Sequence, residues 1–206
     1  SATHEIPERV ILKNNIFPTM FQLLRDAQPE AEIGCIYEWD GIKYVIDTLS
    51  TSYQEMVPPS KIYTDEMAKM SVKYIKEKKP VLGAFIFDNP DHVGHDAGHD
   101  TPEYYANLKE LDEYIGQIIQ ATKDAGIYEN CIFIVTSDHG GIDHGHGGKT
   151  LEEINTPFII AGKGVKKGGE FQESMMQFDC APTVLEIFGL EGPQVWVGRS
   201  MSQVFE

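Results

Sequence analysis

Six of the seven histidines of this 206-residue chain fall in two short segments that also contain aspartate and glycine. They are His92, His95 and His99 in residues 89–100, here the first histidine segment, and His139, His144 and His146 in residues 138–149, the second histidine segment. Carboxylate and neutral imidazole together form a ligand set that suits zinc, and also manganese or iron. Two polar, glycine-rich surface connections are the alternative interpretation, but they give no reason for both segments to combine the same residue types. The clustering therefore predicts a metal site.

The spacing within each segment indicates which side chains point to one place. Asp91 and His95 are four residues apart in the first histidine segment, where Pro90 and Gly94 favour a loop over a helix. The second histidine segment opens with an adjacent Asp-His pair directly after an apolar run. Such a pair offers one oxygen and one nitrogen ligand at the end of a buried strand.

Short apolar runs alternate with helical periodicity along the chain, which is the pattern of an α/β domain. The predicted strands are residues 33–39, 81–87, 131–137 and 157–161, and the predicted helices are residues 18–27, 63–78, 102–125 and 181–188. The continuous apolar character of the strands predicts a mostly parallel sheet with helices on both faces. We interpret residues 1–206 as a single domain, because the chain is too short for two large ones.

Both histidine segments directly follow predicted strands, at residues 81–87 and 131–137. Ligands of open α/β sheets bind outside the carboxyl ends of the strands. The predicted fold therefore brings the two segments to the edge of the sheet where a site is expected.

The chain carries a formal net charge of −15, from 17 basic and 32 acidic residues. Such a surface repels the phosphates of a nucleic-acid duplex and anionic lipid, so neither is expected as a partner. An anionic substrate would also be repelled, unless bound cations reverse the local field. No apolar run approaches the roughly 18 residues that a membrane span needs, so no membrane span is predicted.

The three cysteines, Cys35, Cys131 and Cys180, show no C-x-x-C spacing. They therefore indicate neither a disulfide framework nor a thiolate metal site. Cys35 and Cys131 lie in apolar runs and are predicted to be small buried hydrophobic residues.

Three motifs in and around these segments resemble the metal motifs of the alkaline phosphatase superfamily. They are Asp-His-Val-Gly-His at residues 91–95, Ser-Asp-His-Gly-Gly at residues 137–141 and Gly-His-Gly-Gly at residues 145–148. Their order and spacing resemble most the branch that contains type I phosphodiesterases, nucleotide pyrophosphatases and sulfatase-like hydrolases. The strand at residues 156–160 and the segment at residues 179–183 extend the resemblance, which covers roughly residues 15–200.

The resemblance implies two divalent metal ions about 4 Å apart. By this resemblance, Asp91, His95 and His146 hold one ion, and Asp138 and His139 hold part of the other. Zinc is the metal expected first, with manganese or calcium as the alternatives.

The other side chains of the two segments leave choices open. His144 competes with His146 as a ligand because both precede a glycine, and the Gly-His-Gly-Gly form of the family motif favours His146. His92 and His99 are expected to lie beside the ligands or in solvent. Lys149 either contacts an anionic substrate or is a solvated loop lysine.

The activity that the resemblance implies is hydrolysis of a small-molecule phosphate ester, with a sulfatase-like hydrolase as the alternative. A threonine or serine alkoxide attacks phosphorus and forms a covalent intermediate, which water then hydrolyses. The two ions neutralise charge on the phosphate oxygens. The choice among monoester, diester, phosphonate and sulfate stays open, as does the oligomeric state. A periplasmic or extracellular location is implied by the family alone.

Two features of the superfamily are not found in the sequence. Its members begin with a strand that ends in an aspartate ligand, followed by a loop that holds the threonine or serine nucleophile. Thr3 and Thr19 are the early threonines here, and neither is assigned as the nucleophile, which is expected upstream of Ser1. We therefore interpret the chain as the C-terminal portion of a larger catalytic domain, with one competent metal site and little activity of its own.

Two other interpretations remain open. One is a complete enzyme that hydrolyses esters with the three-ligand site alone and without a covalent intermediate. The other is a catalytically inactive domain that a metal ion stabilises for binding.

Overall fold

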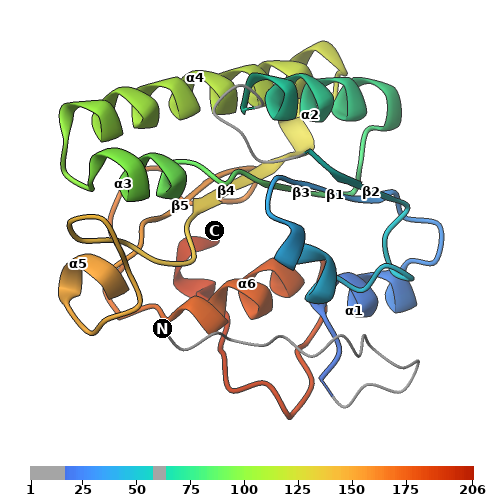
Figure 1. Ribbon diagram of the computed structural model, residues 1–206. Helices are drawn as coiled ribbons and strands as arrows, with labels where there is room; N and C mark the ends of the chain where they lie inside the picture. The colour runs from blue at the N-terminus through green and yellow to red at the C-terminus, as the bar shows by residue number, and fades with distance from the viewer. Residues whose placement is uncertain (1–16, 58–63) are drawn as a thin grey trace.

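The computed structural model describes residues 17–57 and 64–206 as an α/β arrangement (Figure 1). Its strands are β1 (Ile33–Tyr37), β2 (Tyr53–Met56), β3 (Leu82–Ile86), β4 (Ile132–Thr136) and β5 (Phe158–Gly162). Its α-helices are α1 (Met20–Ala27), α2 (Thr64–Lys78), α3 (Asp91–Ala97), α4 (Pro102–Asp124), α5 (Leu151–Ile154) and α6 (Cys180–Ile187). Short 3₁₀ helices cover Asp40–Tyr44, Tyr128–Asn130, Gln177–Asp179 and Ser202–Val204. None of the described helices is both long and apolar enough to cross a bilayer.

The strands form a central layer with helices on both sides (Figure 1). α2 and α4 pack together on one side, and α1 and α6 pack together on the other. β1 lies between β2 and β3 and runs parallel to both, with Gly34 opposite Tyr53 and Ile33 opposite Leu82. The predicted α/β class, with helices on both faces of a parallel sheet, is confirmed.

β1 is at the centre of the hydrophobic core, because all five of its residues are buried. Side chains alternate between the two faces of a strand. Ile33, Cys35 and Tyr37 accordingly pack with residues of α1, and Ile36 packs with residues of α2. The predicted burial of Cys35 is confirmed, whereas Cys131, just before β4, is only half-buried.

The predicted strands and helices are confirmed to within two residues at each described end. The Thr-Pro sequence at residues 101–102 predicts a cap followed by a proline at the first helical position of α4. Both are found, since the hydroxyl of Thr101 accepts a hydrogen bond from the N–H of Tyr104. Thr19 caps α1 in the same way, accepting from the N–H of Gln22. Its hydroxyl is thus used by the backbone, in agreement with its rejection as a nucleophile. Tyr63, the predicted start of α2, lies outside the described residues, as does Thr3.

Two features of the strands differ from the prediction. β2 was not predicted, because its four residues, Tyr-Gln-Glu-Met, are not a continuous apolar run. β5 runs antiparallel to β4, and its Ile159 is 60% exposed, unlike a strand covered on both faces. The connection between these strands, residues 137–157, joins the carboxyl end of β4 to the adjacent start of β5, where Thr136 lies opposite Phe158. Because the connection stays at one edge of the sheet, β5 runs back along β4, whereas a parallel strand would need a crossover to the other edge.

The 3–4 spacing of apolar residues in the sequence predicts one buried face for α4, and the observed buried stripe is displaced slightly from it. The predicted face consists of Leu108, Leu111, Ile115, Ile118 and Ile119. Leu111 and Ile118 are buried as predicted, and Tyr114 and Ala121 continue the stripe at the same helical spacing. Leu108, predicted on the same face, is exposed at the start of the helix. The stripe faces α2, which it helps to hold over the sheet.

Glu38 is a buried carboxylic acid directly after β1, with 1% of its surface exposed. Its main-chain N–H donates to the carbonyl of Ile86, and its Oε2 accepts a hydrogen bond of 2.8 Å from the N–H of Asp88. Oε1 has no hydrogen-bond partner among the described residues. Burial raises the pKa of Glu38 to about 7, although the hydrogen bond from Asp88 acts in the opposite direction. Glu38 therefore ties the end of β1 to the turn that follows β3.

We expect the substitution Glu38→Gln to remove a pH-dependent loss of stability. The fold raises the pKa of Glu38 above its ordinary value of 4.5, because burial favours the neutral acid. The contribution of neutral Glu38 to the stability of the folded chain is therefore complete below about pH 4.5 and is lost as the pH rises through about 7. Glutamine stays neutral and can still accept the hydrogen bond from Asp88. We measure the free energy of unfolding in urea for both proteins from about pH 4.5 to about pH 8. Over this range the value for the unmodified chain should fall on the order of 2–3 kcal/mol further than the value for the variant. Parallel pH profiles of the two proteins would contradict this assignment.

Candidate metal centre

The first histidine segment folds largely into α3, so the predicted loop is wrong there. Pro90 precedes the first helical residue, where its missing N–H costs nothing. Gly94 lies inside the helix, and a Cβ at this position would be 2.4 Å from Nε2 of His99. A neighbouring side chain, rather than a turn, therefore requires this glycine. The helix is important for the site because it puts Asp91 and His95, four residues apart, on one face.

The second histidine segment is a loop, as predicted. A turn within it is closed by two main-chain hydrogen bonds between Ile142 and Gly145. The same turn is bound to the residues after α3, because the main-chain carbonyl of Asp143 accepts hydrogen bonds from the N–H and the ring Nδ1 of His99. The loop is thus held against the first histidine segment.

His95 and His144 form a second and reciprocal link between the two segments. Nδ1 of His95 donates to the main-chain oxygen of His144 at 2.9 Å, and Nδ1 of His144 donates to the main-chain oxygen of His95 at 3.1 Å. A carbonyl can only accept, so each Nδ1 carries the hydrogen. In the neutral imidazole of His95, Nε2 then has a free lone pair, which is the form that a metal ligand needs.

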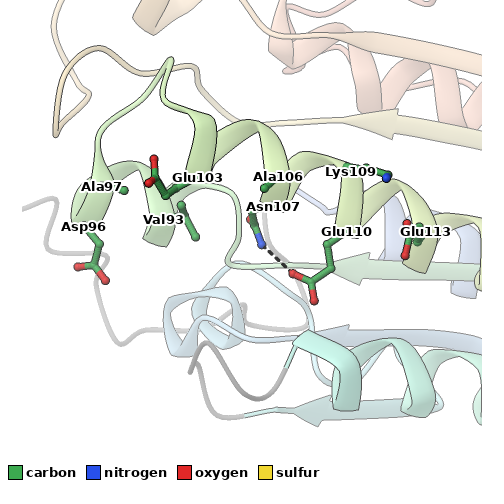
Figure 2. Close-up of a pocket in the computed structure, with 9 residues that line it drawn as sticks. All are labelled: Val93, Asp96, Ala97, Glu103, Ala106, Asn107, Lys109, Glu110 and Glu113. Atoms are coloured by element: carbon green, nitrogen blue, oxygen red, sulfur yellow. Dashed lines mark hydrogen bonds between the residues drawn. The ribbon is translucent and has the colours of Figure 1, made fainter.

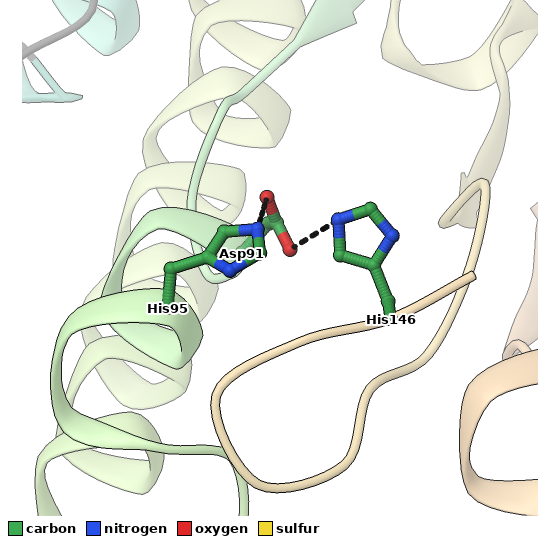
Figure 3. Close-up of side chains that lie close together, drawn as sticks. All are labelled: Asp91, His95 and His146. Atoms are coloured by element: carbon green, nitrogen blue, oxygen red, sulfur yellow. Dashed lines mark ion pairs between the residues drawn. The ribbon is translucent and has the colours of Figure 1, made fainter. Parts of the chain in front are cut away.

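Asp91, His95 and His146 converge at the point where the two segments meet (Figure 3). Oδ2 of Asp91 lies 3.3 Å from Nε2 of His95, and Oδ1 lies 3.5 Å from Nε2 of His146. One ligand atom from each of the three side chains lies within 4.8 Å of the others. No other group of three such ligands was found among residues 17–57 and 64–206.

The chemistry of this cluster fits a divalent metal ion. A carboxylate and two imidazoles are a ligand set found in zinc sites that keep a position open for water or substrate. Oδ1 of Asp91 is also buried without a hydrogen-bond partner among the described residues. A buried acceptor without a donor is costly, and a cation would satisfy it.

His146 is prepared for metal binding by its surroundings. Burial holds the pKa of His146 below its ordinary value, and the nearby His139 acts in the same direction. Asp91 opposes these effects without cancelling them. The imidazole is therefore neutral at neutral pH, which is the state that coordinates a metal.

Asp138 and His139 lie beside the cluster but do not complete a second group of three. The ring of His139 stacks on the ring of His146 with centroids 3.8 Å apart, and its Nδ1 donates to the carbonyl of Gly140. This hydrogen bond leaves Nε2 of His139 free in the neutral ring. The Asp138 side chain is 88% exposed, and its Oδ2 lies 3.7 Å from Nε2 of His139. Their role as ligands of a second ion stays a prediction.

The remaining candidates are placed outside the converging group. His144 is not among the three side chains whose ligand atoms converge, so the geometry favours His146 over His144. His92 is half-exposed with its Nε2 3.8 Å from Oδ2 of Asp96. Lys149 is exposed, and its side chain makes no hydrogen bond or ion pair with the residues that the structure describes. Its contact with a substrate stays a prediction.

A groove of about 620 Å³ runs between α3 and α4 (Figure 2). Its charged lining is mainly acidic, from Asp96, Glu103, Glu110 and Glu113, with Lys109 as the one lining cation. This negative field disfavours a phosphate or sulfate ester. None of the three converging ligands lines this groove, so the groove and the metal cluster are separate features.

Two solved structures share the fold of this chain. One is described as "Crystal structure of Ps i-CgsB", with a TM-score of 0.68 and 14% identity over 88% of this chain and 56% of that chain. The other is a putative sulfatase from Bacteroides thetaiotaomicron, with a TM-score of 0.66 and 17% identity over 91% of this chain and 56% of that chain. These likenesses show that the α/β fold of this chain is sulfatase-like and alkaline-phosphatase-like.

The family profile described as "Type I phosphodiesterase / nucleotide pyrophosphatase" matches residues 36–176, and the chain belongs to this family. The matched residues include both histidine segments. The resemblance to the alkaline phosphatase superfamily is thereby confirmed.

Curated relatives resemble parts of this chain under several names. A 2,3-bisphosphoglycerate-independent phosphoglycerate mutase of Acetivibrio thermocellus is 27% identical over 175 residues, which are 82% of this chain and 32% of that protein. Ectonucleotide pyrophosphatase/phosphodiesterase family member 5 of Homo sapiens is 29% identical over 103 residues, 50% of this chain and 21% of that protein. Arylsulfatase K of Bos taurus is 33% identical over 103 residues, 48% of this chain and 19% of that protein. The chain thus spans a third or less of the length of these relatives.

We predict that His146→Ala weakens zinc binding far more than His144→Ala. The first change removes one of three converging ligands, and we expect a loss of at least about 100-fold in affinity. The second change leaves the main-chain oxygen of His144 in place for the ring of His95, and we expect a loss of less than about tenfold. Competition with a chromogenic chelator measures both affinities. Equal losses, or a larger loss for His144→Ala, would assign the third ligand to His144.

Proposed function

We propose that this chain provides a metal centre for the hydrolysis of small-molecule phosphate esters. The observation that carries the proposal is the convergence of Asp91, His95 and His146 from two segments that are remote in the sequence. Membership of the phosphodiesterase family supports the same class of substrate. Zinc is the metal that the donor set favours.

The charge of the chain is a reason for a metal in this reaction. With a formal net charge of −15, the protein repels a phosphate or sulfate ester. A bound divalent ion would supply positive charge that attracts the ester and stabilises negative charge on its oxygens. Asp91, His95 and His146 would hold that charge at the surface, since the side chains of both histidines are exposed to solvent.

We also propose that the nucleophile and the full second metal site belong to a longer parent protein. Among the described residues, no serine or threonine hydroxyl is hydrogen-bonded to Asp91, His95 or His146. Asp138 and His139 supply only two ligands, and a stable zinc site usually takes three or four from the protein. This chain by itself is therefore a metal-binding domain with little or no esterase activity.

Sulfate esters are the second candidate substrate class. The similarity to a protein named arylsulfatase K and to a solved putative sulfatase favours this alternative. Phosphate and sulfate esters are both tetrahedral anions, and a three-ligand metal centre attracts either of them. Discrimination between the two requires activity measurements.

The test is metal binding and turnover by the purified chain. We expect about one tightly bound zinc ion per chain, held by the three-ligand site. Turnover of bis(p-nitrophenyl) phosphate, p-nitrophenyl phosphate and p-nitrophenyl sulfate should stay at the level of His95→Ala, the matched control. Two tightly bound ions would contradict the one-site proposal. Turnover that His95→Ala abolishes would show a complete enzyme, and the ester that reacts would identify the substrate class.

A further inference from the structure

Glu153 in α5 is buried where a surface helix normally exposes its acidic residues. It is 8% exposed, whereas its apolar neighbours Leu151 and Ile154 are 65% and 56% exposed. Charged residues are rarely buried unless they are paired or hydrogen-bonded. This short helix thus reverses the usual orientation, with the carboxylate inside and the apolar side chains outside.

The contacts of Glu153 hold both ends of the loop that carries His146. Its Oε1 accepts a hydrogen bond of 2.8 Å from the N–H of Gly148, two residues after His146. Its main-chain oxygen accepts a hydrogen bond of 2.8 Å from the N–H of Gly140. Its Oε2 accepts from the hydroxyl of Thr150 at 2.8 Å and from the N–H of the same residue at 3.3 Å. One residue therefore closes the loop of residues 140–148.

The two glycines at the ends of this loop are required by the same close approach to α5. A Cβ on Gly148 would lie 2.4 Å from Oε2 of Glu153, and a Cβ on Gly140 would lie 2.0 Å from the main-chain oxygen of Glu152. A Cβ at Gly140 would force the backbone of α5 to shift, and a Cβ at Gly148 would displace the carboxylate of Glu153. Gly140 and Gly148 thus reflect the attachment of the two loop ends to α5.

Glu153 accepts these hydrogen bonds as a carboxylate. The hydroxyl of Thr150 and the N–H of Gly148 hold the pKa of Glu153 below its ordinary value. Hydrogen bonds to a charged acceptor are shorter and stronger than those between neutral groups. The attachment of Gly148 is therefore maintained at neutral pH.

We propose that Glu153 is a positioning residue for His146, which acts by fixing the backbone after that ligand at the distance from Asp91 that metal binding requires. The proposal rests on the metal centre of the proposed function and adds the residue that pre-organises its third ligand. Partners that orient a ligand without touching the metal typically contribute tenfold to 100-fold in affinity. His146 comes from a loop, whereas Asp91 and His95 share a helix, so His146 is the ligand that most needs such support.

A role confined to capping α5 is the competing explanation, because the contacts with Thr150 are those of a helix cap. The two roles use different atoms. Thr150→Val removes the hydroxyl that bonds to Oε2 and leaves the N–H of Gly148 on Oε1. Glu153→Ala removes both contacts, and Glu153→Gln keeps an oxygen that can accept from Gly148.

The experiment measures zinc affinity and the exchange of the Gly148 amide in the full chain and these three variants. We expect Glu153→Ala to weaken zinc binding by about 10- to 100-fold, with a smaller loss in Glu153→Gln and a near-unchanged affinity in Thr150→Val. In the chelated, metal-free protein, NMR hydrogen exchange of the Gly148 amide should be at least about tenfold faster in Glu153→Ala than in Thr150→Val, because only the former loses the acceptor.

Unchanged zinc affinity in Glu153→Ala, or an equal loss in Thr150→Val, would overturn the positioning role. If Glu153→Ala does not fold, the zinc affinities of Glu153→Gln and Thr150→Val are compared instead. A larger loss of affinity in Thr150→Val than in Glu153→Gln would contradict the proposal. Failure of the unmodified chain to bind zinc would instead contradict the proposed function. The exchange of the Gly148 amide is measured without metal, so it separates these two failures.

Discussion

Hydrogen bonds between the two histidine segments are the interaction on which the proposed metal centre depends, and those between His95 and His144 are reciprocal. They join α3 to a loop 49 residues further along the chain, and they use main-chain oxygens as acceptors on both sides. Asp91 and His95 come from the helix, and His146 comes from the loop, so the three ligands converge only while the two segments stay together. The same hydrogen bonds put the proton of His95 on Nδ1 and leave Nε2 toward Asp91. One contact therefore sets both the position and the protonation form of a ligand.

Two buried carboxylates attach these segments to the rest of the fold. Glu38 accepts the N–H of Asp88, three residues before Asp91, and Glu153 accepts the N–H of Gly148, two residues after His146. Their electrostatic states differ, since burial raises the pKa of Glu38 whereas hydrogen bonds lower the pKa of Glu153. A carboxylate that bonds to a backbone N–H restrains the chain without occupying a coordination position. Both groups restrain the segments that carry the proposed ligands without being among those ligands.

Much of the scaffold could be predicted from the sequence because its signals are local. Apolar runs located β1, β3, β4 and β5, and caps such as Thr101 located helix ends. The structure brings Asp91, His95 and His146 together, and their role as metal ligands stays a prediction. The prediction of a loop at α3 was wrong because Gly94 was interpreted as a turn residue. Gly94 instead makes room for the ring of His99, a tertiary contact that the local sequence does not indicate. The hydrogen bonds of Glu38 with Asp88 and of His99 with Asp143 were missed for the same reason. The antiparallel pairing of β5 with β4 depends on a connection that stays at one edge of the sheet.

Anomalous X-ray diffraction from crystals of the zinc-loaded chain can show whether Asp91, His95 and His146 bind one metal ion together. We predict an anomalous peak at the zinc edge within about 2.0–2.2 Å of a carboxylate oxygen of Asp91 and of Nε2 of both histidines. A zinc peak bound by other side chains, or none between these three in zinc-loaded crystals, would contradict the account.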